Sequence, residues 1–165
     1  YNTAGELVAY TESGDYVPAT PAASYLYDKN GRLRVATDAT GHTRYFVYDK
    51  IGRKIADVDE YGGITEYRYN AKGWLNATVR YAGLVASTHL TTLANPDSDV
   101  EAATIRPSAQ AGDVWSWRVY DKEGRLLETI EGDGSAVASA SSSPSLPLAL
   151  RASLRPRSGA PMTFW

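Results

Sequence analysis

Side chains that could carry out catalysis or bind a metal are few and scattered in this chain of 165 residues. It has no cysteine and two histidines, His42 and His89, which excludes thiolate catalysis and cysteine-based zinc or iron–sulfur sites. It contains no His-Glu-x-x-His zinc motif, no Gly-x-Ser-x-Gly nucleophile elbow and no Gly-Lys-Ser/Thr phosphate loop. Asp38 and Asp59 could act as paired carboxylates or calcium ligands, but each opens a turn signature that already accounts for it. The sequence therefore predicts no catalytic residue, no metal site and no cofactor.

Arginine and tryptophan side chains offer two further kinds of binding site. Arginine binds anions, and the faces of aromatic rings suit the apolar faces of sugars. Each candidate arginine follows a turn glycine, where it can pair with a neighbouring carboxylate, and aromatic residues of strands more commonly pack on one another. A carbohydrate contact therefore stands as an alternative beside this structural interpretation. The arginines are Arg32, Arg53 and Arg125, and the tryptophans are Trp74, Trp115 and Trp117.

Composition and charge exclude other classes of protein. With a formal net charge of −2, the chain lacks the strongly basic character of a nucleic-acid-binding protein. No apolar run approaches the roughly 20 residues that a transmembrane helix needs, so the sequence predicts no membrane span. The chain opens on Tyr1 in mid-pattern, without an initiator methionine or a signal segment. We therefore expect it to be a fragment of a longer protein.

The strongest pattern in the sequence is an internal repeat built on tyrosine. A motif of the form Tyr-Asp/Asn-x-x-Gly begins at residues 27, 48 and 69, a period of 21 residues, and returns at residue 120, while a weaker copy starts at Tyr1. A second turn motif, Asp/Glu-x-x-Gly, follows at the same offset in each strong copy except the one at residue 69. Such self-similarity at a fixed period indicates a repeat architecture. The motif residues are Tyr27, Asp28, Gly31, Arg32, Tyr48, Asp49, Gly52, Arg53, Tyr69, Asn70, Gly73, Tyr120, Asp121, Gly124 and Arg125, and those of the second turn are Asp38, Gly41, Asp59, Gly62 and Gly134.

Turn chemistry explains the repeat and predicts its fold. An Asp or Asn that opens a four-residue turn can accept backbone N–H bonds within it, and the closing glycine tolerates a positive φ. We therefore expect positive φ at Gly31, Gly52 and Gly124. The segments 32–37, 42–48 and 64–69 between turns are strand-length and rich in Val, Ile, Thr and Tyr. Two turns in each period give two strands, so the sequence predicts an all-β fold in which hairpins form a continuous antiparallel sheet.

The strand periodicity makes two further predictions. Tyr27, Tyr48 and Tyr69 should stand in register on adjoining repeats, with their side chains on a common face of the sheet. The edges of the sheet, near residues 1–10 and 125–130, should be paired, either with the rest of a longer shell or with another copy of the chain, because natural proteins rarely leave such edges open.

These residues carry a family resemblance. The Tyr-Asp-x-x-Gly-Arg-Leu element, with a second Asp-x-x-Gly ten residues on, resembles the YD repeat of bacterial RHS proteins, and related shells occur in insecticidal Tc toxin complexes and animal teneurins. The resemblance covers about residues 1–134 and is specific at 27–83 and 120–134. It implies β-hairpins that spiral into a large hollow shell, which encloses a C-terminal, often toxic, polypeptide or presents a surface to other cells. Nothing here resembles the family's C-terminal core segment with its self-cleavage aspartates, so the resemblance implies an architecture and a scaffold role without autoproteolysis.

The pattern divides the chain into four segments. Residues 1–83 form a YD-repeat hairpin array, and residues 114–134 form a further repeat. Residues 84–113 interrupt the period as an insertion or loop, with a short helix expected around residues 99–105. Residues 135–165 form a tail rich in Ser, Ala, Pro and Leu, which is interpreted as a linker, as a misassigned reading, or as a segment that packs on a neighbouring molecule.

The functional prediction is a structural one. The chain is expected to be a scaffold fragment of an RHS-like protein that is exported or lies at the bacterial cell surface, and not an enzyme. Its partner would be the rest of a longer RHS-type polypeptide, which encloses a cargo or builds a surface assembly, or other copies of itself. The alternatives are a self-assembling fibre or adhesin subunit joined through sheet edges, a carbohydrate-binding module, and a toxin enzyme whose toxic part lies outside this chain.

Overall fold

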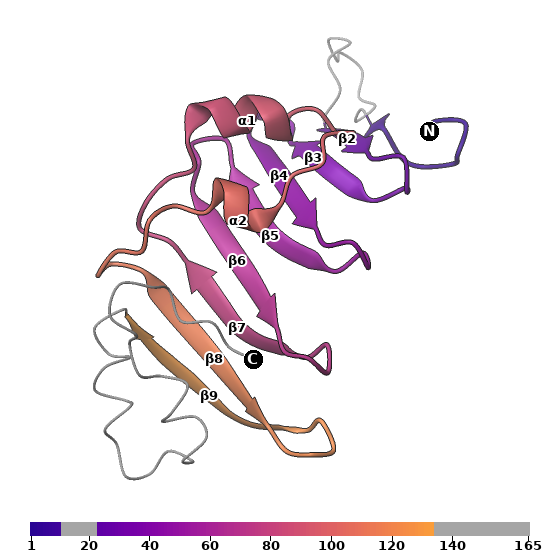
Figure 1. Cartoon of the computed structure of the whole chain (residues 1–165). Coiled ribbons are helices and arrows are strands. Elements are labelled where there is room, and N and C mark those ends of the chain that lie inside the picture. The colour runs from indigo at the N-terminus through magenta and orange to yellow at the C-terminus, as the bar shows by residue number, and fades with distance from the viewer. Residues whose placement is uncertain (11–22, 134–165) are drawn as a thin grey trace. The chain divides into compact units, whose positions relative to one another are not determined.

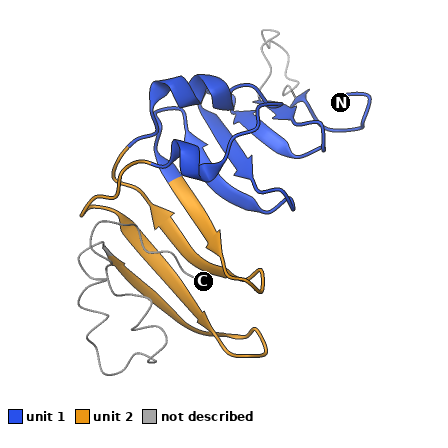
Figure 2. Cartoon of the chain, in the orientation of Figure 1, with its two compact units in different colours: residues 1–64, 84–106 blue, residues 65–83, 107–165 orange. Residues whose placement is uncertain are grey.

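The computed structural model describes residues 1–10 and 23–133 and divides the chain into two compact units. Unit 1 comprises residues 1–64 and 84–106, and the described part of unit 2 comprises residues 65–83 and 107–133 (Figure 2). The regular structure of both units is antiparallel β, apart from two short helices in the described part of the chain. The predicted all-β class is therefore confirmed. The predictions for Gly134 and for the tail at 135–165 concern residues outside the described part of the chain.

The described part of unit 1 contains five strands, each paired antiparallel with the next one described. This meander follows from the alternation of turn motifs and strand-length segments, since a hairpin needs only a short turn to bring two strands together. The strands lie in chain order across the sheet (Figure 1). They are β1 (Ala9–Tyr10), β2 (Ala23–Tyr27), β3 (Leu33–Thr37), β4 (Thr43–Tyr48) and β5 (Lys54–Asp59).

The described part of unit 2 contains the remaining strands in the same kind of meander, except that Ile64, the first residue of β6, belongs to unit 1. Strand β6 pairs with β7, β7 with β8 and β8 with β9, in each case antiparallel. The chain between β7 and β8 is the long segment that interrupts the repeat. The strands are β6 (Ile64–Tyr69), β7 (Leu75–Arg80), β8 (Val114–Tyr120) and β9 (Leu126–Asp133).

The interrupting segment forms two helices and contributes to the core of unit 1. Helix α1 (Ser87–Leu93) and helix α2 (Ala102–Ile105) lie on one face of the unit 1 sheet (Figure 1). Leu93 and Ile105 are buried, as are Val47 and Val58 of the sheet. Residues 84–106 are therefore a packed cover rather than a solvated excursion.

A glycine of the second turn fixes where this cover begins. The N–H of Val85 donates to the carbonyl of Gly62 at 2.8 Å. Gly62 has a φ of +92°, and a Cβ at this position would lie 2.8 Å from the carbonyl oxygen of Val85. Only glycine satisfies both the backbone conformation and this close approach.

The glycine prediction is confirmed at each position where it was made. Gly31, Gly52 and Gly124 have φ values of +72°, +86° and +88°. The hairpin register also shifts by a β-bulge immediately before the motif tyrosine in four hairpins, so that Tyr48, for example, pairs with Lys54. Because a bulge adds local twist and redirects a side chain, its recurrence gives each motif tyrosine the same place in its hairpin.

No helix in the described ranges is long and apolar enough to cross a membrane.

Candidate functional site

The first aspartate of each repeat organises its own turn. One carboxylate oxygen of Asp28 accepts the backbone N–H groups of Asn30 and Arg32 at 2.9 and 3.0 Å. The other oxygen accepts the Nε–H of the Arg32 side chain at 2.8 Å. Asp49 and Asp121 hold Arg53 and Arg125 in the same way, with Nε–O distances of 2.7 Å in both. The Asp and Arg of the motif are therefore partners within one turn.

Electrostatics favours the charged form of these carboxylates. Burial alone would raise the pKa of Asp28, but the hydrogen bonds from Arg32 and Asn30 outweigh it and lower the pKa below its ordinary value. The hydrogen bonds from Arg125 lower the pKa of Asp121. At neutral pH these groups are ion-pair partners rather than proton donors or acceptors for a reaction.

The third strong copy shows which part of the turn is essential. Asn70 replaces the aspartate, and its side-chain oxygen still accepts the N–H groups of Lys72 and Trp74 at 3.0 Å each. Trp74 replaces the arginine, so no ion pair is formed between these two side chains. The oxygen that accepts turn N–H groups is retained while the charge is lost.

The aspartates of the second turn have the same local role. Asp38 accepts the N–H groups of Thr40 and His42, and Asp59 accepts those of Tyr61 and Gly63. Within residues 1–10 and 23–133, no group of three or more His, Asp or Glu side chains lies close enough together to hold a metal ion.

His42 forms the clearest pair of titratable groups on the surface of unit 1. Its Nδ1 lies 2.6 Å from a carboxylate oxygen of Glu60. The hydrogen bond and charge of Glu60 raise the pKa of His42, and the charge of Asp38 adds to the effect. The side chain of His42 is 62% exposed. The pair is therefore a surface ion pair, and it lines an open cleft of about 760 Å³ in unit 1.

The motif tyrosines connect one repeat to the preceding one. The hydroxyl of Tyr27 donates to the carbonyl of Leu7 at 3.0 Å, that of Tyr48 to Leu33 at 2.9 Å, and that of Tyr120 to Leu75 at 2.8 Å. Each acceptor lies two residues after the turn glycine of the earlier repeat. The phenol thus crosses from one hairpin to the next and bonds to an equivalent backbone oxygen each time. We call this contact the tyrosine lock.

A second contact runs in the opposite direction, from a repeat to its successor. The guanidinium of Arg32 lies 5.1 Å from the centre of the Tyr48 ring, and its Nη1–H donates to the carbonyl of Asp49 at 3.2 Å. Cation–π attraction and a hydrogen bond therefore act on the same neighbouring turn. Together with the tyrosine lock, this contact links adjacent hairpins through side chains as well as through the sheet.

Trp74 preserves this second contact by different chemistry. Its ring lies 5.4 Å from the ring of Tyr120, tilted by 50°, so that an aromatic pair replaces the cation–π contact. The ammonium of Lys72 lies 4.7 Å from the Trp74 ring. Trp74 is half-buried in this arrangement, which explains why a tryptophan can stand where other copies have arginine.

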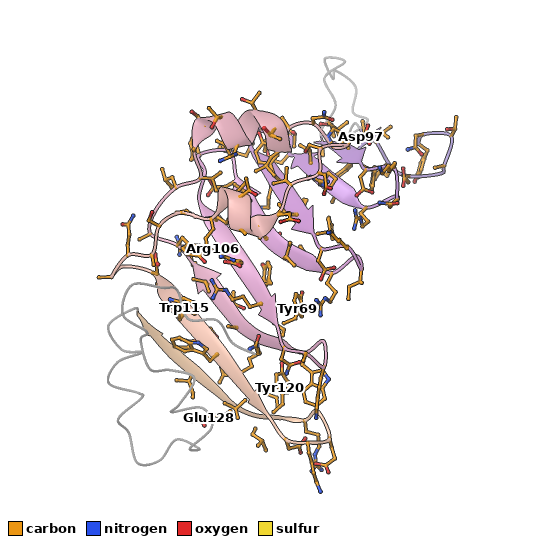
Figure 3. All side chains as sticks on the ribbon, viewed as in Figure 1. Tyr69, Asp97, Arg106, Trp115, Tyr120 and Glu128 are labelled. Carbon is orange, nitrogen blue, oxygen red and sulfur yellow. The ribbon has the colours of Figure 1, made fainter. Side chains whose placement is uncertain are left out.

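Trp115 and Trp117 are packed inside unit 2. Their rings stack with a centroid separation of 5.4 Å, and the residues are 9% and 3% exposed. Arg68 lies over the Trp115 ring at 4.8 Å and hydrogen-bonds Glu66 and Tyr81. Figure 3 shows Trp115 and Tyr120 projecting from the same strand, β8. This burial leaves neither Trp115 nor Trp117 an open ring face for a sugar.

A polar cleft of about 700 Å³ lies in unit 1, between the first turns of two repeats and the segment that joins α1 to α2. Arg34 lines it and is 6% exposed. Its side chain donates to the carbonyls of Phe46 and Ser98 at 2.9 and 3.2 Å, which attaches the interrupting segment to the sheet. Burial lowers the pKa of Arg34. Charges of both signs line the cleft, with Asp97 on the joining segment (Figure 3), so its geometry does not specify an anion or a cation.

Three features of the described residues were not predicted from the sequence. The hydroxyl bonds of the tyrosines were not predicted, although their period of 21 residues was visible. Arg34 and Glu66 were not singled out because neither belongs to the repeated motif. A charged residue in the middle of a predicted strand, next to an apolar residue such as Val35, was the signal that could have found them.

Comparisons with known proteins assign no family to the chain. No protein-family model matches it, and no curated protein matches it. Among solved structures, it is similar to one titled "Crystal Structure of TcdB2-TccC3-Cdc42", with 12% identity and a TM-score of 0.31, and to "Crystal Structure of TcdB2-TccC3-TEV", with 15% identity and a TM-score of 0.28. Each match covers 66% of this chain and 7% of the matched chain. The chain therefore spans a small fraction of these proteins, and similarity at this level assigns neither a family nor a function.

Proposed function

We propose that the chain is a structural scaffold segment of an RHS-like protein that is exported or lies at the bacterial cell surface. In this proposal it has no catalytic activity, and its repeats form part of a wall that encloses a cargo or builds a surface assembly. The observation that carries the proposal is the tyrosine lock, which repeats with the same donor, the same type of acceptor and distances of 2.8 to 3.0 Å.

Repeated contacts of this kind suit a wall. Each lock joins a hairpin only to its immediate predecessor, so stability accumulates as a sum of repeats and nearest-neighbour contacts. The length of such an array can change without redesign of any one repeat. An enzyme or a small-ligand module has no need of equivalent contacts along the chain.

The use of the charged motif residues supports the same proposal. Arg32 donates hydrogen bonds to Asp28 in its own turn and to the carbonyl of Asp49 in the next repeat. Arg125 donates to Asp121 in the same way as Arg32 donates to Asp28. The side chains that sequence patterns offered for anion or metal binding therefore already have structural partners. The resemblance to YD repeats adds the expectation of an enclosed C-terminal cargo.

Protease protection in the polypeptide encoded by the complete gene tests this function. An enclosed cargo should resist a protease that digests the same cargo segment expressed alone, and it should become sensitive once mild denaturant opens the wall. A cargo segment digested equally fast in both forms would contradict enclosure.

A second candidate function is a fibre or adhesin subunit joined through sheet edges. The observation that favours it is the exposed apolar surface of β8 and β9, where Val114, Leu126 and Leu127 are 53%, 52% and 65% exposed. Light scattering of the isolated chain across a range of concentrations separates the two candidates. Ordered growth with concentration supports the fibre, and a monomer at every concentration excludes it.

A carbohydrate-binding module is not carried forward, since Trp115 and Trp117 are buried and Trp74 packs against Tyr120 and Lys72.

A further inference from the structure

We propose that a groove between two turns of unit 2 binds a phosphate group, which Lys72, Arg118 and Lys122 hold. The groove has a volume of about 440 Å³ and lies between the first turns of the repeats that begin at Tyr69 and Tyr120. This binding site goes beyond the scaffold function and does not depend on it.

The lining of the groove carries an excess of positive charge. Lys72, Arg118 and Lys122 line it, and Asp121 is the one carboxylate among the described residues that do so. Asp121 is already held by Arg125, whose Nε–H donates to it at 2.7 Å. The polar cleft of unit 1 differs, because five acidic and five basic residues line it. A groove with an excess of one sign of charge attracts ligands of the opposite sign.

The three cations have weak or neutral partners. The Nη1–H of Arg118 donates to the hydroxyl of Thr78 at 3.0 Å. The ammonium of Lys72 lies 3.5 Å from the carbonyl oxygen of Lys122, which belongs to the other turn. The ammonium of Lys122 is 89% exposed and lies 3.6 Å from the carboxylate of Glu123. Within residues 1–10 and 23–133, neither Lys72 nor Arg118 forms an ion pair with a carboxylate, so both can receive an anion.

Departures from the repeat produce this charge. Asn70 replaces an aspartate, Lys72 replaces an uncharged or acidic residue, and Arg118 replaces an aromatic residue. The turn needs only the acceptor oxygen that Asn70 supplies, so its fold does not require the lysine or the arginine. Three departures from two repeats meet in one groove, and departures from a regular pattern are expected at functional sites. The residues at the three corresponding positions of the other strong copies are Asp28, Asp49 and Asp121; Asn30, Ile51 and Glu123; and Tyr25, Phe46 and Tyr67.

The chemistry of the cations favours phosphate over a carboxylate. A guanidinium presents parallel N–H donors that match two phosphate oxygens, and an ammonium supplies a point charge. A phosphate monoester carries about 1.5–2 negative charges at neutral pH and three acceptor oxygens, whereas a carboxylate carries a single charge and two oxygens. One guanidinium and two ammonium groups therefore suit the phosphate. A soluble phosphate ester and a lipid headgroup present the same chemistry to the groove.

An NMR titration of the 165-residue chain with inorganic phosphate tests the site. The backbone amide signals of residues 70–74 and 118–122 should shift and reach saturation as phosphate is added. Sodium chloride at the same ionic strength should give no saturable shift, because chloride cannot accept several directed hydrogen bonds from the three cations at once. The chloride titration thus separates a phosphate site from general screening of surface charge.

Variants of the chain assign the binding to the groove. Arg118→Gln should weaken phosphate binding about ten-fold, the loss that a charge-assisted hydrogen bond gives. Lys122→Gln should weaken it about three-fold, as expected for an exposed ion pair. Lys50→Gln is the matched control, because Lys50 is an exposed lysine at the same position of the motif in unit 1, and it should leave binding unchanged.

Asn70→Asp is the sharpest variant, because it restores the residue that the other strong copies have. The turn keeps its acceptor oxygen, while the added carboxylate competes with phosphate for the cations. Binding should weaken about three-fold. This variant decides the case if Arg118→Gln does not fold, and the amide spectrum of each variant shows whether it is folded.

Vesicles distinguish the two sources of the phosphate. Sedimentation with phosphatidylcholine vesicles that contain phosphatidic acid, reduced by Lys122→Gln, would support the site with a lipid headgroup as ligand. Phosphate-induced shifts without sedimentation would support it with a soluble ester as ligand.

Three outcomes would overturn the proposal. They are equal shifts with chloride and phosphate, saturable shifts centred outside the groove, and unchanged phosphate binding in Asn70→Asp. Sedimentation with vesicles but no shift with inorganic phosphate would also overturn it, since the group recognised would then not be the phosphate.

Discussion

Alanine at Gly124 should destabilise the protein more than alanine at Gly52, although both glycines close the same turn with nearly the same backbone. Their φ values are +88° and +86°. A Cβ at position 124 would lie 2.7 Å from Cζ2 of Trp74, whereas a Cβ at position 52 would have nothing within 4 Å. The pair therefore separates backbone strain from steric contact.

The two contributions can be estimated independently. A left-handed backbone costs an L-residue about 1–2 kcal/mol, which is the whole loss expected for Gly52→Ala. Forcing a methyl group against a packed ring adds about 1–3 kcal/mol. We therefore expect Gly124→Ala to lower the free energy of unfolding by about 2–5 kcal/mol, the sum of the two ranges.

Trp74→Arg offers a matched background, because arginine is the residue that other copies have at this position. In that background Gly124→Ala should cost only about 1–2 kcal/mol, the backbone contribution alone. Urea unfolding followed by far-UV circular dichroism and tryptophan fluorescence measures each loss. Equal losses at positions 52 and 124, or no change on replacing Trp74, would refute the proposed contact.

Three further predictions concern the lock, the turn and the surface ion pair. Tyr48→Phe should lower the free energy of unfolding by about 1 kcal/mol, because the carbonyl of Leu33 loses its side-chain donor. Tyr1→Phe is the control and should have no effect, since Tyr1 is 83% exposed. An equal loss of stability in both variants would contradict the tyrosine lock. Asp28→Ala should lower the free energy of unfolding, measured in urea, by about 1–3 kcal/mol. Asp28→Asn should lower it less, because Asn70 accepts the equivalent turn N–H groups in its own repeat. A larger loss of stability for asparagine than for alanine would contradict the role of this side chain as acceptor of the turn N–H groups. Because Glu60 raises the pKa of His42 above its ordinary 6.5, the pair should stabilise the folded state fully below pH 6.5 and lose that contribution as the pH rises through the folded-state pKa. Titration by NMR should show the pKa of His42 falling in Glu60→Gln, and an unchanged pKa would remove Glu60 as the cause.

The hairpins could be predicted from sequence because their signals are local. The segment 64–69 was predicted as a strand and is β6, and the segment 42–48 differs from β4 by one residue at its start. Turn N–H groups, an Asp or Asn oxygen and a glycine at positive φ all lie within five residues of one another. Repetition of such a signal makes its interpretation secure.

The cover of unit 1 could not be predicted in the same way. Helix α1 contains three threonines and has no side-chain hydrogen bond at its N-cap, so its own helix propensity is low. It is stabilised by tertiary burial, with Leu93 only 1% exposed. The short helix expected around residues 99–105 corresponds to α2. The hydrogen bond from Arg34 to Ser98, in contrast, joins residues 64 positions apart, so no local sequence signal predicts it.

The candidate site was only partly predictable for the same reason. The residue types of the motif were evident, but a tyrosine in a strand does not reveal where its hydroxyl points. The stacking of Trp115 on Trp117 follows from their spacing on one face of β8, whereas their burial depends on the packing of the whole unit. Function was predicted from the repeat and not from any assembled group of reactive side chains.

Electron microscopy of the polypeptide encoded by the complete gene tests the scaffold assignment most directly. We expect a closed hollow particle in which residues 23–133 form part of the wall, with the tyrosine of each repeat against its predecessor. A solid filament of stacked copies, or a compact domain with β9 exposed to solvent, would contradict it.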